Sequence, residues 1–154
     1  MKEAFEKLIA RQDLDRSEME RCFELIMSGQ VNDVQIGGFL TALRIKGETP
    51  AEIETAARVM RSHAVPVDTG CDVVVDTCGT GGDGASTFNI STAAAFVMAG
   101  AGYHVAKHGN RSVSSSSGSA DCLEALGVPI TLGPGDAARA VREKGFCFLF
   151  APAY

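Results

Sequence analysis

The spacing of apolar residues changes once along this chain, between residues 65 and 70, and this change limits the folds open to it. Before it, apolar residues recur every three or four positions, as in helices with one buried face. After it, short apolar runs alternate with helical segments, which is typical of a parallel sheet with right-handed crossovers. We therefore predict an α/β protein with a helical bundle over residues 1–64, a linker over 65–70 and a parallel-sheet α/β domain over 71–154.

The first 64 residues predict short helices joined by short turns, which is a small bundle. Ser17–Glu20 and Thr49–Glu52 have the sequence of capping boxes, and Pro50 stands at the first position of a helix that extends to about His63. In a third helix, Val34–Ile45, a Gly37–Gly38 pair permits close helix contact. The predicted buried stripes are Met1, Ala4, Phe5, Leu8 and Ile9 in the first helix, and Met19, Cys22, Phe23 and Ile26 in the second, which ends at Gly29.

The rest of the chain predicts strands that alternate with helices. Val73–Val75 is a β-branched run of the kind that parallel sheets bury on both faces. The further predicted strands are His104–Ala106, a possible short strand at Pro129–Leu132, and Phe146–Phe150. The predicted helices are Ser91–Gly100, which is apolar enough to be buried, Ser119–Leu126, ended by Gly127, and Asp136–Lys144, ended by Gly145.

Composition excludes several classes of protein. With 45% apolar and 21% charged residues, the 154-residue chain is an ordinary globular domain and not a disordered one. Its apolar stretches are shorter than a membrane span, and Met1–Glu3 opens no apolar signal region. A net charge of −5 argues against nucleic-acid binding. Five cysteines, none spaced as C-x-x-C, fit a reduced cytoplasmic interior better than disulfides or a zinc site.

A glycine-rich loop, Gly79–Gly84, follows the first predicted strand. Glycines let backbone N–H groups approach a phosphate closely, and Asn89–Thr92 opens the next helix, whose free N–H groups also favour an anion. The loop matches neither the dinucleotide-binding nor the Walker pattern. A tight turn, with Asn89 or Ser91 as the helix cap, explains it equally well.

A second loop adds cations to this arrangement. Lys107–Arg111 ends the second predicted strand, and a serine-rich stretch follows as far as Ser119. Ligands of open α/β sheets bind where such loops leave the carboxyl ends of the strands, so the two loops together predict a polyphosphate site. The alternatives are a solvated pair, Lys107 and Arg111, and a flexible serine loop.

Four motifs, Gly79–Asp83, Asn89–Thr92, Lys107–Arg111 and Gly118–Asp121 with Leu123–Glu124, resemble those of the anthranilate phosphoribosyltransferase family. The resemblance runs from about Phe5 to Tyr154 and places the chain in glycosyltransferase family 3, with its nucleoside phosphorylase-like fold. It implies transfer of phosphoribosyl from 5-phosphoribosyl 1-diphosphate to the amine of anthranilate in tryptophan biosynthesis. It also implies Mg²⁺, a cytoplasmic homodimer formed through the bundle, and neither nucleic acid nor membrane as a partner.

The resemblance also implies the roles of individual residues. Ser91 matches a magnesium ligand, and Gly79 and Asn110 match positions near anthranilate. No covalent nucleophile is implied; Lys107 and His108 would position substrate and stabilise charge, with a catalytic role for His108 as the alternative. Cys78 is a packed thiol or a reactive one. The implied donor site comprises Gly79, Gly82, Asp83, Thr87, Asn89, Ile90, Ser91, Thr92, Lys107, His108, Gly109, Asn110, Arg111, Ser112, Val113, Ser114, Ser115 and Ser119.

The chain departs from the family at two points. Ser116 stands where relatives have a basic residue, and the chain stops at Tyr154, before the family's anthranilate-binding arginine and its acidic magnesium ligands. We therefore expect a fragment, the first part of the phosphoribosyltransferase domain, that is inactive alone. Two other functions are weighed: a pyrimidine-nucleoside phosphorylase, whose second loop lacks Lys107–Arg111, and a nucleic-acid-binding paralogue, which the acidic charge disfavours.

Overall fold

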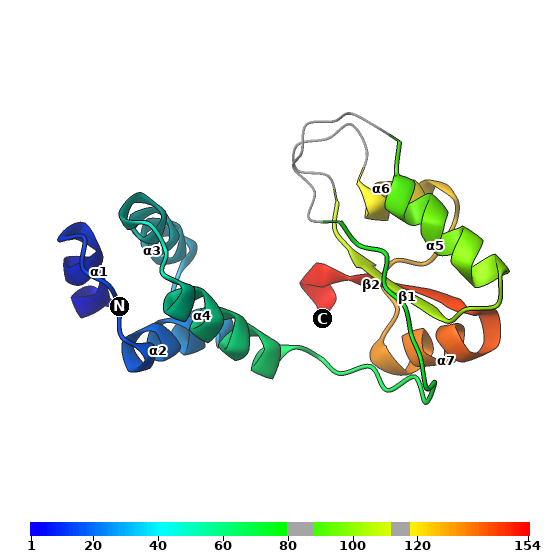
Figure 1. Cartoon of the computed structure of the whole chain (residues 1–154), viewed down its shortest axis with the longest axis horizontal. Coiled ribbons are helices and arrows are strands. Elements are labelled where there is room, and N and C mark those ends of the chain that lie inside the picture. The colour runs from blue at the N-terminus through cyan, green and yellow to red at the C-terminus, as the bar shows by residue number, and fades with distance from the viewer. Residues whose placement is uncertain (80–87, 112–117) are drawn as a thin grey trace. The chain divides into compact units, whose positions relative to one another are not determined.

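A computed structural model describes residues 1–79, 88–111 and 118–154 of the chain (Figure 1). It has two compact units, Met1–Ala64 and Val65–Tyr154. No helix among the described residues is both long enough and apolar enough to cross a membrane.

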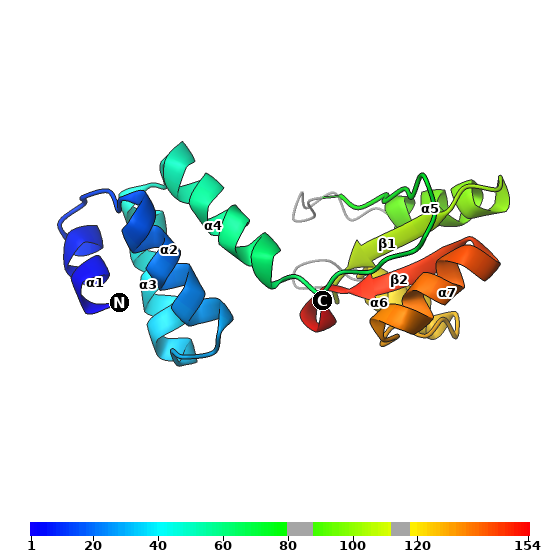
Figure 2. The ribbon, with the colours of Figure 1, turned by 90° about the horizontal axis from the view of Figure 1, so that it is seen from below.

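The first unit is a bundle of four helices: α1 (Lys2–Ile9), α2 (Arg16–Met27), α3 (Asp33–Lys46) and α4 (Pro50–His63) (Figure 2). Phe39 of α3 is fully buried at its centre, with Phe5 and Phe23 edge-on at ring-centroid distances of 6.4 and 6.1 Å. The stripe predicted for α2 forms part of this core, as do Ala4 and Leu8 of α1. An added Cβ at Gly38 would lie 3.3 Å from the Phe5 ring, so this glycine allows the close packing of α1 on α3.

Two details of the predicted bundle are wrong. Ile9 is exposed, because it is the last residue of an eight-residue helix and lies beyond the packed stripe. The cap of α2 is Asp15 and not Ser17: the Asp15 side chain accepts the Glu18 N–H, and the Glu18 side chain accepts the Asp15 N–H. Asp15 therefore starts the helix two residues early. The capping box at Thr49–Glu52 is confirmed.

A buried carboxylate joins the turns of the bundle. Glu52 is 1% exposed and accepts the N–H of Leu14 at 2.9 Å and that of Thr49 at 2.8 Å. The Lys46 ammonium lies 2.8 Å from Glu52 and 2.7 Å from Asp13. These bonds connect the α1–α2 loop to the start of α4. Burial raises the pKa of Glu52, but its hydrogen bonds from Lys46, Thr49 and Leu14 outweigh burial and hold the pKa below its ordinary value.

The second unit contains a small parallel sheet. β1 (Val105–Gly109) pairs with β2 (Phe146–Phe150) in the register Val105 to Phe146 and Gly109 to Phe150. On the other side of β1, Val75 donates its N–H to His104 and accepts the N–H of Ala106, at 2.9 and 3.0 Å. The order across the sheet is therefore Val75, β1, β2, and the predicted parallel sheet is confirmed.

Helices cover both faces of β2. Successive residues of a strand point to opposite faces: Phe148 packs against Ala120 and Leu123 of α6 (Ser119–Ala125), whereas Cys147 packs against α7 (Pro134–Lys144). α5 (Ile90–Gly100) contacts the same strand through Phe96, whose ring stacks on Phe146 at 4.8 Å. A short 3₁₀ helix, η1 (Ala151–Ala153), precedes Tyr154, whose hydroxyl donates to Leu132.

Three expectations for the second unit are wrong. Only Val75 of the run Val73–Val75 pairs with the sheet, and Val73 is 67% exposed, because this segment is an edge with β1 on one side alone. Pro129–Leu132 is not a strand, although Ile130 is buried against Leu123 and Phe148. α5 is only partly buried: Thr92 and Ala95 face the core, but Val97 is exposed.

Candidate functional site

Three hydrogen bonds draw the ends of four segments together in the second unit. The Thr77 hydroxyl donates to the backbone oxygen of Ser91 at 2.7 Å, which links the segment after Val75 to the start of α5. The Asn89 amide donates to Gly118 at 3.4 Å, and the Ala120 N–H donates to Asn110 at 3.3 Å. The start of α5, the end of β1 and the start of α6 therefore meet, and they carry Asn89, Ser91, Asn110 and Ser119 of the predicted site.

Lys107 supplies a buried cation beside this junction. It lies in β1 opposite Phe148 and is 1% exposed. Burial lowers the pKa of its ammonium, although Asp76 and Cys78 act in the opposite direction. Within residues 1–79, 88–111 and 118–154, the ammonium has no ion pair or hydrogen bond. A buried cation without a protein counter-ion favours an anionic ligand.

The first turn of α5 is an end that favours anions. Its backbone N–H groups lack partners within the helix, and the helix dipole adds positive charge there. The Thr92 hydroxyl is the one buried side-chain oxygen of the described residues that has no hydrogen-bond partner. Ser91 precedes it, so hydroxyl and N–H donors stand together at this end of the helix, as the sequence predicted.

An aspartate and a histidine form a pair that the sequence analysis missed. Oδ2 of Asp76 lies 2.5 Å from Nδ1 of His108, and Oδ1 of Asp76 accepts the His108 N–H at 3.4 Å. Burial raises the pKa of Asp76, but the hydrogen bond and charge of His108 outweigh it, and the pKa lies below its ordinary value. The available signal was the place of Asp76, directly after the first predicted strand.

A soft-metal site does not explain this pair. Ligand atoms of Asp76, Cys78 and His108 lie within 4.8 Å of one another. However, Asp76 and His108 already bond each other, burial and the charge of Asp76 raise the pKa of the Cys78 thiol, and the Lys107 cation is close enough to oppose that rise. Mg²⁺ prefers hard oxygen ligands together with phosphate and water. The Ser91 hydroxyl, in the first turn of α5, fits that preference.

Arg111 is held by protein carboxylates. Its guanidinium lies 2.8 and 3.0 Å from the two carboxylate oxygens of Glu124 and 3.0 Å from Asp121, and it sits 6.0 Å from the centre of the Phe150 ring. These bonds raise the pKa of Arg111 and lower that of Glu124. In this arrangement Arg111 fixes the chain after β1 against α6.

Gly109 allows that close approach. A Cβ at this position would lie 2.2 Å from the Ser119 hydroxyl and 3.1 Å from the Phe148 ring. Gly79 and Ile90 are also described, and both are exposed. The remaining predicted donor-site residues, Gly82, Asp83, Thr87, Ser112, Val113, Ser114 and Ser115, lie outside the described residues.

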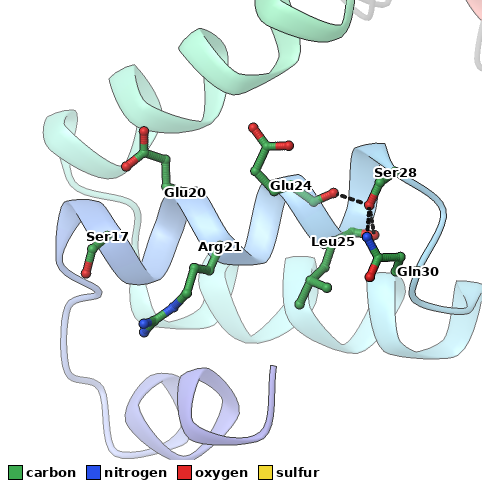
Figure 3. Close-up of a pocket in the computed structure, with 7 residues that line it drawn as sticks. All are labelled: Ser17, Glu20, Arg21, Glu24, Leu25, Ser28 and Gln30. Atoms are coloured by element: carbon green, nitrogen blue, oxygen red, sulfur yellow. Dashed lines mark hydrogen bonds between the residues drawn. The ribbon is translucent and has the colours of Figure 1, made fainter.

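A pocket on the bundle is a separate feature. It is lined by Ser17, Glu20, Arg21, Glu24, Leu25, Ser28 and Gln30, on and just after α2 (Figure 3). Its carboxylates are already paired with α4: Glu20 lies 2.6 Å from Arg58, and Glu24 lies 2.7 Å from His63. Hydrogen bonds also join Ser28 to Gln30 and to the backbone of Glu24. Neither carboxylate of the pocket is therefore free to bind a ligand.

The chain thus combines a helical bundle with an α/β unit, in which a helix end suited to anions lies beside a buried lysine. The comparisons with known proteins find the same two parts in one family. Residues 2–64 match the helical bundle domain of the glycosyl transferase family, and residues 71–154 match its a/b domain. The chain belongs to this glycosyl transferase family.

Two curated relatives share one name. The anthranilate phosphoribosyltransferase of Cellvibrio japonicus is 56% identical over all of this chain, and that of Desulfosudis oleivorans is 60% identical over 96% of it. The chain spans about 45% of the length of these curated relatives.

Solved structures extend the similarity to the fold. The crystal structure of anthranilate phosphoribosyltransferase from Thermus thermophilus matches 97% of this chain, and the match covers 46% of that protein, with 45% identity and a TM-score of 0.82. The enzyme from Saccharomyces cerevisiae, in complex with PRPP and Mg, matches the same shares with 31% identity and a TM-score of 0.82.

Proposed function

We propose that this chain carries the donor-binding part of an anthranilate phosphoribosyltransferase, which moves phosphoribosyl from 5-phosphoribosyl 1-diphosphate to the amine of anthranilate. The observation that carries the proposal is the buried Lys107 side chain, whose ammonium has no ion pair within the described part of the chain, beside the donor-rich start of α5. The names of the relatives, and the PRPP and Mg in the yeast structure, support this choice of substrates.

The donor's diphosphate would bind at this junction. Lys107 neutralises part of its charge, and the first turn of α5 gives it N–H and hydroxyl donors. Mg²⁺, held in part by the Ser91 oxygen, would supply further neutralisation of the diphosphate. No covalent nucleophile is needed, because diphosphate leaves as the amine attacks the anomeric carbon of the ribose. Positioning and charge stabilisation account for the rate.

Anthranilate would bind at the end of β1. Gly79 and Asn110 are its proposed neighbours, and Asn110 is held in place by the bonds that its backbone oxygen accepts from Ala120 and Ser119. The ring of His108 stands beside this position in sequence and is half exposed. The aromatic acceptor and the anionic donor would thus meet at one edge of the sheet.

The protein is proposed to be a cytoplasmic homodimer that associates through its bundle. Large apolar side chains of the bundle are exposed, among them Val34, Leu40, Ile45 and Ile53. All five cysteines are free, which suits a reducing compartment.

Calorimetry with 5-phosphoribosyl 1-diphosphate tests the donor site on the chain itself. We expect Lys107→Met, which keeps an apolar stem in the buried position, to weaken binding about tenfold or more, since a charge-assisted contact is worth about 1.5–3 kcal/mol. Lys144→Met, on the exposed end of α7, is the matched control and should bind like the parent chain. Equal affinity in both variants would remove Lys107 from the site.

A further inference from the structure

Asp76 and His108 are brought together by the sheet itself. Val75 pairs with β1 through two backbone hydrogen bonds, and Asp76 is the next residue, at the carboxyl end of the paired segment. His108 is the fourth residue of β1 and pairs with Leu149 on its other side. The contact between their side chains is therefore set by rigid, hydrogen-bonded backbone on both sides of β1.

Every hydrogen bond recorded for the Asp76 carboxylate comes from a donor of the protein. Oδ1 accepts the Cys78 N–H at 3.1 Å and the His108 N–H at 3.4 Å, and Oδ2 lies 2.5 Å from Nδ1 of the His108 ring. Because a low pKa keeps this carboxylate ionised, it can only accept, so Nδ1 must carry the proton. In the neutral form of such a ring, the free electron pair is on Nε2.

We propose that Asp76 is a positioning residue that fixes the Nδ1–H tautomer of His108, so that Nε2 accepts a proton from the substrate's aromatic amine. The choice of amine rests on the function proposed above; the assignment of the tautomer does not. Hydrogen bonds recorded for this ring within the described residues involve Nδ1 and leave Nε2 available. A purely structural role for Asp76 would not require the proton to be on one particular nitrogen of the His108 ring.

One proton moves from the amine to His108 as the new bond forms. The amine nitrogen forms a bond to the anomeric carbon while the bond from that carbon to the diphosphate oxygen breaks, and its electron pair leaves with the diphosphate. The nitrogen becomes cationic and releases one proton to Nε2 of His108. The resulting imidazolium is stabilised by the Asp76 carboxylate, as in a carboxylate–histidine pair of other enzymes. The neutral imidazole ring is restored when this proton passes to water.

Asp76→Asn tests the tautomer with little change in shape. The asparagine oxygen can still accept the Cys78 N–H, but its NH₂ group would face Nδ1 and donate to it. We expect the His108 proton to move to Nε2 in the variant. The measurement is two-dimensional ¹⁵N NMR of the imidazole rings at neutral pH, and it is tractable because the chain has only three histidines. His108→Gln identifies the signals of this ring.

The matched control is Asp72→Asn, which makes the same change at an exposed aspartate four residues earlier. It should leave the His108 signals unchanged. A parent chain whose His108 is protonated on Nε2, or an Asp76→Asn variant that keeps the parent tautomer, would overturn the proposal. The spectrum of the parent chain decides the first point even if Asp76→Asn fails to fold.

Kinetics test the second half of the proposal. In a form of the protein that turns over, Asp76→Asn should lower kcat about a hundredfold or more and leave the KM for the donor unchanged. A change in the donor KM with kcat unchanged would contradict the proton-acceptor role. An Nδ1–H tautomer in a protein that accepts another substrate instead of anthranilate would refute the proposed function and leave the positioning role of Asp76 standing.

Discussion

At the scale of single residues, burial of charge serves two different purposes in this protein. Glu52 is buried with all its partners: Lys46 and two backbone N–H groups satisfy its carboxylate. Lys107 is equally buried but lacks a counter-ion among the described residues. The paired Glu52 holds turns of the bundle together. Burying Lys107 without a counter-ion lowers the stability of the fold, and an anionic ligand would offset that cost.

Removing the charge of Glu52 should therefore weaken the fold and flatten its dependence on pH. Glu52→Gln places an NH₂ group against protein donors, and we expect a loss of about 2–4 kcal/mol at pH 7. The pKa of Glu52 is lower in the folded chain than its ordinary 4.5, so its contribution is complete above that value and is lost as the pH falls through the folded pKa.

Urea unfolding followed by far-UV circular dichroism at pH 7 and pH 3.5 measures this effect. The difference between the parent chain and Glu52→Gln should shrink at the lower pH. Glu54→Gln, which loses only half-exposed ion pairs with Arg16 and Arg58, is the control on the same helix and should cost less than about 1 kcal/mol. A parent chain and Glu52→Gln variant of equal stability at pH 7 would contradict the role of this carboxylate.

At the scale of elements, the sequence predicted those features that depend on residues close together in the chain. The helices of the bundle, β2 and the cap at Thr49–Glu52 follow from spacing and capping residues, and they are confirmed. The burial of Val73 could not be predicted, because it depends on what lies beside the segment and not on its own β-branched residues. Asp15 caps α2 in place of Ser17, two residues later, because Glu18 stands three residues after Asp15 and completes a capping box with it.

The candidate site also has parts that the sequence predicted and parts that it did not. Gly-rich and basic motifs indicated an anion site, and the structure brings Asn89, Ser91 and Asn110 together as expected. Asp76 and His108 are 32 residues apart, and their pairing depends on the register between Val75 and β1, so it leaves no local pattern in the sequence. The engagement of Arg111 by Glu124 is likewise a product of how β1 meets α6.

That junction predicts the effect of a single methyl group. Gly109→Ala would place a Cβ 2.2 Å from the Ser119 hydroxyl and 3.1 Å from the Phe148 ring, so β1 and α6 must move apart. We expect a loss of about 1–3 kcal/mol, seen as a lower thermal midpoint. Gly135→Ala, at an open position in α7, is the control and should be neutral or slightly stabilising. An unchanged thermal midpoint for Gly109→Ala would mean that β1 and α6 can move apart at little cost in stability.

At the scale of the whole molecule, the bundle has more apolar surface than its own core uses. α3 buries Phe39 and Leu43 on one side, yet Val34 and Ile45 on the same helix are 83% and 66% exposed. These two residues are eleven positions apart, which is about three turns, so they lie on one face. A helix that is apolar on both sides is usually covered on both. A second copy of the chain supplies that cover in the homodimer proposed above.

Reversing the character of this face should produce monomers. Val34→Glu with Ile45→Glu places two carboxylates on this face of each copy. Around a twofold axis the carboxylates of one copy would face those of the other, and the apolar contact between the copies would be lost. We expect sedimentation at micromolar concentration to show a dimer for the parent chain and a monomer for the double variant, with the same helical signal because neither residue is in the core. Arg139→Glu, at an exposed position of α7 in the second unit, changes charge outside the bundle sequence; it is the control and should leave the dimer intact. A monomeric parent chain, or a double variant that remains dimeric, would exclude this face of α3 from the interface.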